Sequence, residues 1–255
     1  MYNAQGQYEK ALVYYKNALK IQEDVFGESH PFTATVYNNM AGVYSAQGQY
    51  EQSLEYYQKA LKIQMKLLGK DHPSIATTCN NLALLYSDKG LYEKALEYYK
   101  KTLEILKKVL VKNHPSIATT YNNLALTYKA QGQYKKAIEY YEKAMRIQAK
   151  VLGECHTSTA KTYNNIAGVY RVQKQYEKAL EYYDRALNIL EKVLGENHPS
   201  TAITYCNIAG VYRDQGDSEK ALNYYKKAEE VFREKLGIEH PYTKIAIDNV
   251  ENSRS

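Results

Sequence analysis

The sequence predicts an all-α protein built from repeated antiparallel helix pairs, and three observations support this prediction. The dipeptide His-Pro recurs every 42 residues, and His156-Thr157 fills the one position where the series would otherwise be broken. Within each interval, apolar side chains follow the i, i+3, i+4, i+7 spacing of amphipathic helices. In most intervals a glycine separates two such stretches, where it can adopt the left-handed backbone of a tight turn. A repeat of this length indicates stacked units that bury their apolar faces against one another.

The interval 114–155 illustrates the predicted helix pair. The proline of its His-Pro dipeptide suits a first helical turn, where a missing N–H costs nothing. An apolar stripe runs from Tyr121 to Tyr128, and Gly132 ends that helix. A second stripe follows and stops before Gly153, which we interpret as a C-terminal cap. Neither helix can bury its stripe alone, so neighbouring pairs must stack.

The repeat register divides the chain into a partial repeat, five full repeats and a C-terminal capping helix within a single domain. Their residues are 1–29, 30–71, 72–113, 114–155, 156–197, 198–239 and 240–255. The partial repeat holds mainly a second helix, and Tyr2 stands at the last core position of its first helix. This incomplete end predicts either a piece cut from a longer protein or an apolar end that self-associates or packs against something else.

Bulk composition agrees with an ordinary globular protein. The 255 residues are 44% apolar and 24% charged, and no apolar run approaches the roughly 18 residues of a membrane span, so no membrane partner is expected. The N-terminus lacks a signal-peptide layout. Three scattered cysteines suggest neither a disulfide framework nor a zinc site, which favours a reducing, cytoplasmic location. The net charge of +6 is modest for this length.

These residues resemble the tetratricopeptide repeat, whose pattern places a large aromatic, Leu, a small residue and Tyr on the first helix, then Ala, an aromatic and Ala on the second. In the middle repeat the pattern is matched by Tyr121, Leu124, Ala125, Tyr128, Ala137, Tyr141 and Ala144. The other full repeats match similarly, with departures at Cys79, Ser53 and Thr102. The 42-residue form, with NNLA, YEKAL and LGxxHP, is similar to kinesin light chains. This resemblance implies a right-handed superhelical solenoid whose first helices line a concave face that binds a protein or peptide.

Asparagines recur in the first helices although asparagine is a weak helix former. On a helical projection they lie outside the core stripe. A carboxamide both donates and accepts hydrogen bonds, so a row of them can pair with the backbone of an extended peptide. The alternative is that the amides bond across to the neighbouring helix and set the twist. We call this series, with Cys206 in one of its positions, the asparagine ladder: Asn38, Asn39, Asn80, Asn81, Asn122, Asn123, Asn164, Asn165 and Asn207.

Cationic side chains add charge to the same face in the C-terminal half. Lys129, Arg171 and Arg213 occupy a position that is serine in earlier repeats, and Lys161 replaces a threonine. Asp214 partly offsets Arg213. Cations around a groove favour carboxylates or phosphates, so the predicted ligand is a linear, acidic peptide segment. The alternative is that they are ordinary solvated helix charges.

The inner wall also differs from that of chaperone-tail tetratricopeptide domains. Their two-carboxylate clamp needs lysine where this chain has the first asparagine of each pair, so a chaperone-tail ligand is not expected. Gly42, Gly168 and Gly210 leave shallow spaces on the wall. Such spaces would either admit side chains of a docked peptide or allow close helix packing.

No catalytic residue, metal or cofactor is predicted. All six histidines belong to the repeat register and lie too far apart to share a zinc ion, so we interpret them as part of the turn before each first helix. No phosphate loop, GxSxG or HExxH motif occurs. RNA binding would need stacking aromatics or a strongly basic stripe, so no nucleic-acid partner is expected. The competing hypothesis is an architectural or self-associating region of a larger signalling or sensor protein.

Lys174 stands where the other full repeats have glycine between their helices. A left-handed backbone at lysine would cost roughly 1 kcal/mol. We therefore predict that residues 156–176 open more readily than residues 114–134.

Overall fold

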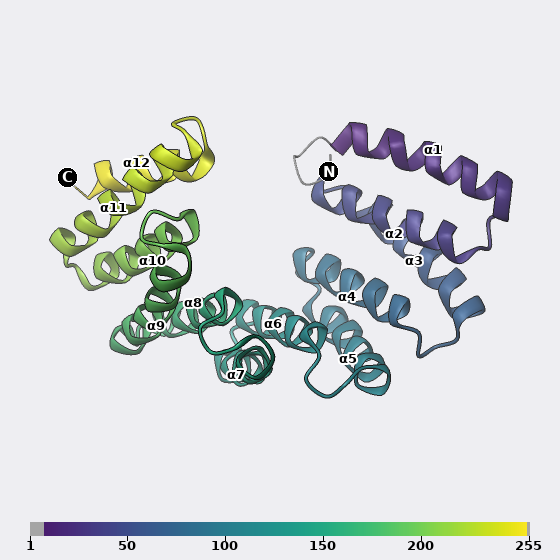
Figure 1. Ribbon diagram of the computed structural model, residues 1–255, viewed down its shortest axis with the longest axis horizontal. Helices are drawn as coiled ribbons and strands as arrows, with labels where there is room; N and C mark the ends of the chain where they lie inside the picture. Colours follow the sequence, from purple (N-terminus) through teal and green to yellow (C-terminus); the bar gives the residue numbers. More distant parts are fainter. Residues whose placement is uncertain (1–7, 254–255) are drawn as a thin grey trace. The chain divides into compact units, whose positions relative to one another are not determined.

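The computed structural model describes residues 8–253, and every regular element in that range is an α-helix (Figure 1). This confirms the all-α prediction. Tyr2 lies outside the described residues. The helices group by their contacts into two compact units, residues 1–131 and 132–255, which are described separately below.

Unit 1 begins with a helix that corresponds to the second helix of a repeat. Two helix pairs and one first helix follow it. Its helices are α1 (Tyr8–Phe26), α2 (Pro31–Ala46), α3 (Tyr50–Leu68), α4 (Pro73–Asp88), α5 (Tyr92–Val109) and α6 (Pro115–Ala130). Helix α2 pairs with α3 and α4 pairs with α5, each through a short turn (Figure 1). Helix α3 also packs against α4, and α5 against α6, so each second helix contacts the first helices on both sides. The first helices α2, α4 and α6 contact one another in that order.

Unit 2 repeats this arrangement. Its helices are α7 (Tyr134–Leu152), α8 (Thr157–Val172), α9 (Tyr176–Leu194), α10 (Pro199–Gln215), α11 (Ser218–Leu236) and α12 (Pro241–Asn252). Helix α8 pairs with α9 and α10 with α11, while α7 packs on α8 and α12 on α11 (Figure 1). The first helices α8 and α10 are also in contact.

A histidine caps the start of each first helix. Nδ1 of His114 accepts a hydrogen bond from the Ser116 backbone N–H at 3.2 Å, which satisfies one of the amides that a helix N-terminus leaves unpaired. The same bond recurs at His30, His72, His156, His198 and His240. The interpretation of the histidines as part of the turn before the helix is therefore confirmed.

The turn inside each pair needs a left-handed residue. Gly132 takes φ +73°, and Lys174 takes φ +58° at the equivalent position. Among the described residues, Lys174 is the non-glycine residue with positive φ. The conformation predicted for Lys174 is confirmed, and it carries the strain of about 1 kcal/mol that a side chain brings to this region.

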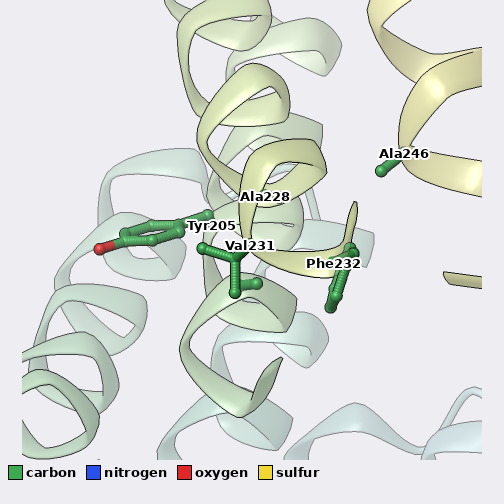
Figure 2. Close-up of a cluster of buried hydrophobic side chains, with 6 residues drawn as sticks. Tyr205, Ala228, Val231, Phe232 and Ala246 are labelled. Atoms are coloured by element: carbon green, nitrogen blue, oxygen red, sulfur yellow. The ribbon is translucent and has the colours of Figure 1, made fainter. Parts of the chain in front are cut away.

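The core lies where each second helix meets the first helices on either side. Small residues allow close approach of the backbones, and large residues fill the remaining space. Figure 2 shows this for one cluster in unit 2, formed by side chains from α10, α11 and α12. The cluster contains Ala202, Tyr205, Ala228, Val231, Phe232 and Ala246.

Candidate functional site

The asparagine ladder lies on the first helices, and its amides join successive first helices in unit 1. Nδ2 of Asn81 on α4 donates to Oδ1 of Asn38 on α2 at 3.3 Å. One repeat further along, Nδ2 of Asn123 on α6 donates to Oδ1 of Asn80 on α4 at 3.2 Å. The hydroxyl oxygen of Thr78 also lies 3.2 Å from Oδ1 of Asn38. In these pairs, the cross-helix interpretation is confirmed.

In unit 2 a ladder amide joins first helices in a different way. Nδ2 of Asn164 on α8 donates to the hydroxyl of Thr204 on α10 at 3.0 Å. Asn165 and Asn207 are half-buried on the same two helices. In unit 1, Asn122 is half-buried on α6, whereas Asn39 is exposed on α2. The ladder is therefore mostly half-buried rather than fully presented to solvent.

These bridges use only part of the hydrogen-bonding capacity of each amide. A carboxamide has two N–H donors and an oxygen that can accept twice. Asn80 uses its oxygen in the bridge to Asn123, and Asn123 uses one N–H. The Nδ2 group of Asn80 and the oxygen of Asn123 are not consumed by that bond. The hydrogen bond thus holds both amides in a defined orientation and leaves some of their donors and acceptors for another partner.

The strongest polar contact between first helices in unit 2 is an ion pair. Nε of Arg171 on α8 lies 2.7 Å from Oδ2 of Asp214 on α10, and Nη2 lies 3.2 Å from Oδ1. The hydrogen bonds that Arg171 donates to Asp214 lower the pKa of the Asp214 carboxyl below its ordinary value and raise the pKa of the Arg171 guanidinium. Asp214 therefore neutralises Arg171, whereas the sequence pointed to Arg213 as the residue it offsets.

The guanidinium of Arg171 lies against Gly210. A Cβ built on Gly210 would be 2.4 Å from Nη1 of Arg171, so only glycine leaves room for the arginine in this position. The expected shallow space at Gly210 is thus occupied by a side chain of the protein itself, and close packing is its explanation.

The other predicted cations differ in exposure. Lys161 on α8 and Arg213 on α10 are exposed, and Lys129 on α6 is half-buried. Nη1 of Arg213 donates to Oδ1 of Asn249 on α12 at 3.4 Å, a long and weak hydrogen bond.

Sequence reasoning missed the partners of these residues, although a signal was present. The Asn38–Asn81, Asn80–Asn123 and Arg171–Asp214 contacts each span 43 positions, one repeat plus one residue. A search for complementary side chains at that spacing would have paired Arg171 with Asp214.

The described residues offer little chemistry beyond polar and charged contacts. None of the three cysteines forms a disulfide, and burial raises the pKa of the Cys79 thiol to about 11 and that of Cys206 to about 12, which keeps both protonated and unreactive near neutral pH. Within residues 8–253, no cluster of three or more His, Cys, Asp or Glu side chains could hold a metal ion. In the same range, no helix has both the length and the apolarity of a membrane span.

Stacked helix pairs with a polar ladder on their first helices define a helical-repeat protein that offers a surface to other proteins. More specifically, the chain belongs to the tetratricopeptide repeat family. The family model matches residues 1–66, 32–108, 75–150 and 158–247, which together cover most of the chain. No curated protein shows a match to this chain.

Solved structures with the same fold are similar along most of the chain. BtubC (BKLC) from P. vanneervenii is 24% identical with a TM-score of 0.73, over 93% of each chain. The TPR-like repeats of a kinesin light chain candidate from Podosopora anserina are 28% identical with a TM-score of 0.68, over 81% of this chain and 98% of that one. The similarity to kinesin light chain-like repeats expected from the sequence is therefore confirmed.

A third structure places this fold inside a larger protein. It is a signal transduction ATPase with numerous domains from Pyrococcus horikoshii, which has a tetratricopeptide repeat sensor. It is 22% identical with a TM-score of 0.75, over 98% of this chain but only 36% of that protein. Tetratricopeptide repeats support protein interaction and scaffolding, and the family is typically non-enzymatic. A protein-interaction or scaffold role is the functional class for this chain.

Proposed function

We propose that the first-helix faces bind a linear, acidic peptide segment whose backbone pairs with the asparagine ladder. The observation that carries this proposal is the bridging of Asn80 to Asn123, which orients both amides and leaves a donor on one and an acceptor on the other. Peptide groups present both partners, a C=O and an N–H. Side chains already held in place lose little entropy when they bind, which favours affinity.

The preference for acidic segments rests on three cations. Lys161 and Arg213 are exposed in unit 2, and Lys129 lies on the first helix that ends unit 1. Arg171 contributes little net charge because Asp214 is paired with it. Exposed charges steer a ligand and are screened by salt, so the acidic preference should weaken as ionic strength rises.

The test is a titration of fluorescently labelled acidic peptides, and of versions with glutamine for glutamate, against the wild type and the Asn123→Ala/Asn165→Ala variant. We expect weaker binding of every peptide to the double variant, because the amides contact the ligand backbone. Asn188→Ala removes an exposed amide from the second helix α9 and serves as a matched control. Thermal melting of each variant checks that the fold is retained. Equal affinity for wild type and double variant would rule out the ladder as the binding site.

A second candidate function, self-association, is favoured by the apolar face of α1. Tyr14 is 60% exposed and Ile21 is 62% exposed on this helix. An exposed aromatic and aliphatic face of this kind suits a contact with another copy or another part of a larger sensor protein. Sedimentation across a concentration range decides this, since a monomer at every concentration argues against self-association.

A further inference from the structure

A cavity of about 330 Å³ lies in unit 1 between α4, α5 and α6. It is partly open rather than sealed. Its volume is at the lower end of the range for pockets that hold small ligands. The residues that line it are Pro73, Ala76, Thr77, Asn80, Thr102, Leu106, Leu110, His114, Ser116, Thr119 and Thr120.

The equivalent place between α10, α11 and α12 of unit 2 is filled. Phe232 lies three 42-residue steps after Leu106 and so occupies the equivalent position. Ala246 and Ala228 are related to Thr120 and Thr102 in the same way. In Figure 2, Phe232 lies in a cluster with Val231, Ala228 and Ala246, and it is 2% exposed. A phenyl ring therefore occupies in unit 2 the position that the shorter leucine leaves hollow in unit 1.

In the repeat before the cavity, a polar side chain fills the equivalent space. Gln64, at the position equivalent to Leu106, is buried and accepts a hydrogen bond from the Thr78 hydroxyl at 2.9 Å. Leu106 cannot accept such a bond, and the Thr120 hydroxyl donates instead to the Ser116 carbonyl at 2.9 Å. Unlike Gln64, Leu106 does not reach across the space between the helices, and the cavity lies there.

The end of α5 also departs from the other second helices. Helix α5 ends at Val109, and Leu110 has an extended backbone with φ −117° and ψ 157°. Val111 occupies the position held by cap glycines such as Gly69 and Gly153 in other repeats. The extended Leu110 places its side chain on the cavity wall, whereas α3 and α7 continue helical through the equivalent leucine.

The lining combines aliphatic side chains with hydroxyl and amide groups. Ala76, Leu106 and Leu110 supply an aliphatic surface, and no acidic or basic side chain other than His114 contributes. Nδ1 of His114 is occupied by the helix cap. Thr119 donates its hydroxyl proton to the carbonyl of Pro115, so its oxygen is left as an acceptor. Such a lining disfavours a carboxylate or an ammonium group and favours a hydrocarbon group.

The cavity is continuous with the ladder. Asn80 lines the cavity and also belongs to the bridge with Asn123. Thr77, Asn80 and Leu84 follow i, i+3, i+7 spacing, so they lie on one face of α4. Leu84 is 38% exposed, which extends the apolar character of that face by one helical turn.

We propose that this cavity is an anchor subsite that takes one uncharged aliphatic side chain, the size of leucine, isoleucine or methionine, from a bound peptide. The inference rests on the proposed function, because the occupant is part of the peptide that the ladder holds. Acidic residues of the ligand then lie outside the cavity, where Lys129 on α6 of the same unit attracts them. Affinity comes from backbone pairing and selectivity from the anchored side chain, as in other recognition of extended peptides.

The test uses short acidic peptides that differ only at one central position, which carries leucine, methionine, alanine or aspartate. We expect leucine and methionine to bind about tenfold more tightly than alanine, since they bury more apolar surface. Leu106→Phe fills the cavity with the side chain that Phe232 supplies in unit 2, and Leu106→Gln restores the arrangement of Gln64. Both should abolish the preference for leucine over alanine. Leu190→Phe, at the equivalent position on α9, is the matched control and should keep it.

Placement is read out independently with photo-leucine at the central position of the peptide. Irradiation should attach it to segments 73–80 and 106–120, and the attachment should disappear in Leu106→Phe. A leucine preference that survives Leu106→Phe, or binding with no preference at the variable position, overturns the subsite while leaving the proposed function intact. If none of these peptides binds the folded wild type, the proposed function fails and the subsite falls with it.

Discussion

Units 1 and 2 have the same repeat register and differ in the side chains that join their first helices and fill their core. Where unit 2 has the Arg171–Asp214 ion pair between first helices, the equivalent positions of unit 1 hold Ser87 and Ala130, and its first helices are joined by amide pairs such as Asn80–Asn123. At the core position of Leu106 and Phe232, unit 1 has a cavity and unit 2 has a packed ring. The repeat pattern therefore determines the helix pairs, while single side chains decide whether a place between them is available to a ligand.

The largest expected difference is in the cost of truncating the two core side chains. Phe232→Ala should destabilise unit 2 by about 4 kcal/mol, because a fully packed ring leaves a new cavity. Leu106→Ala should cost about 2 kcal/mol, because this side chain already borders open space. Repeat arrays need not unfold in one step, so hydrogen exchange of α11 and α5 should accompany thermal melting. Equal destabilisation by the two substitutions would mean that the cavity beside Leu106 does not lower the cost of truncating that side chain.

The ion pair of unit 2 should be the next most sensitive feature. Asp214→Asn should destabilise α8 and α10 by about 1 kcal/mol, a value typical of a partly exposed pair with good geometry. Its pH dependence has a definite sign. The folded pKa of Asp214 is lowered, so the stabilisation is present above the unfolded pKa of about 3.9 and is lost as the pH falls through the folded value.

The measurement is thermal melting of wild type and Asp214→Asn between neutral and strongly acidic pH. The difference between the two proteins should be constant near neutrality and should vanish at the acidic end. Asn80→Asp in unit 1 serves as a comparison, since it adds a carboxylate where no arginine bridge exists. A difference in stability between the two proteins that persists in strong acid would argue that Asp214 acts by packing rather than by charge.

Relief of backbone strain should give a stabilisation of similar size. Lys174→Gly removes the side chain from a position with φ +58° and should stabilise the turn between α8 and α9 by about 1 kcal/mol. Gly132→Ala, at the equivalent turn with φ +73°, should destabilise by a similar amount. Hydrogen exchange should show more rapid opening of 156–176 than of 114–134 in the wild type, and this contrast should shrink in Lys174→Gly. Equal protection of both segments in the wild type would contradict the prediction.

The smallest net effect is expected at Gly210, where two terms oppose each other. Gly210→Ala gains about 1 kcal/mol of helix propensity but displaces Arg171 and weakens its pair with Asp214. The net change in the wild-type background should therefore be near zero. In an Arg171→Ala background the same substitution should stabilise by about 1 kcal/mol, and a double-mutant cycle measures the coupling. Additive effects would show that the arginine and the glycine are independent.

Much of the fold could be predicted from residues that act locally. The histidine caps, the turn glycines and the apolar stripes each depend on side chains within a few positions, so the register placed α6 and α7 correctly around Gly132. The ladder was also located on the first helices, and the left-handed turn at Lys174 was anticipated. Its binding role stays a prediction.

The remaining features depend on helices that come together only in the folded chain. The sequence by itself determined the helix pairs, because caps, turns and periodicity are properties of short segments. Only the tertiary structure decided that Arg171 lies over Gly210 and that Leu106 leaves a cavity, because these outcomes depend on the offset between stacked helices and on the summed volume of side chains from three of them.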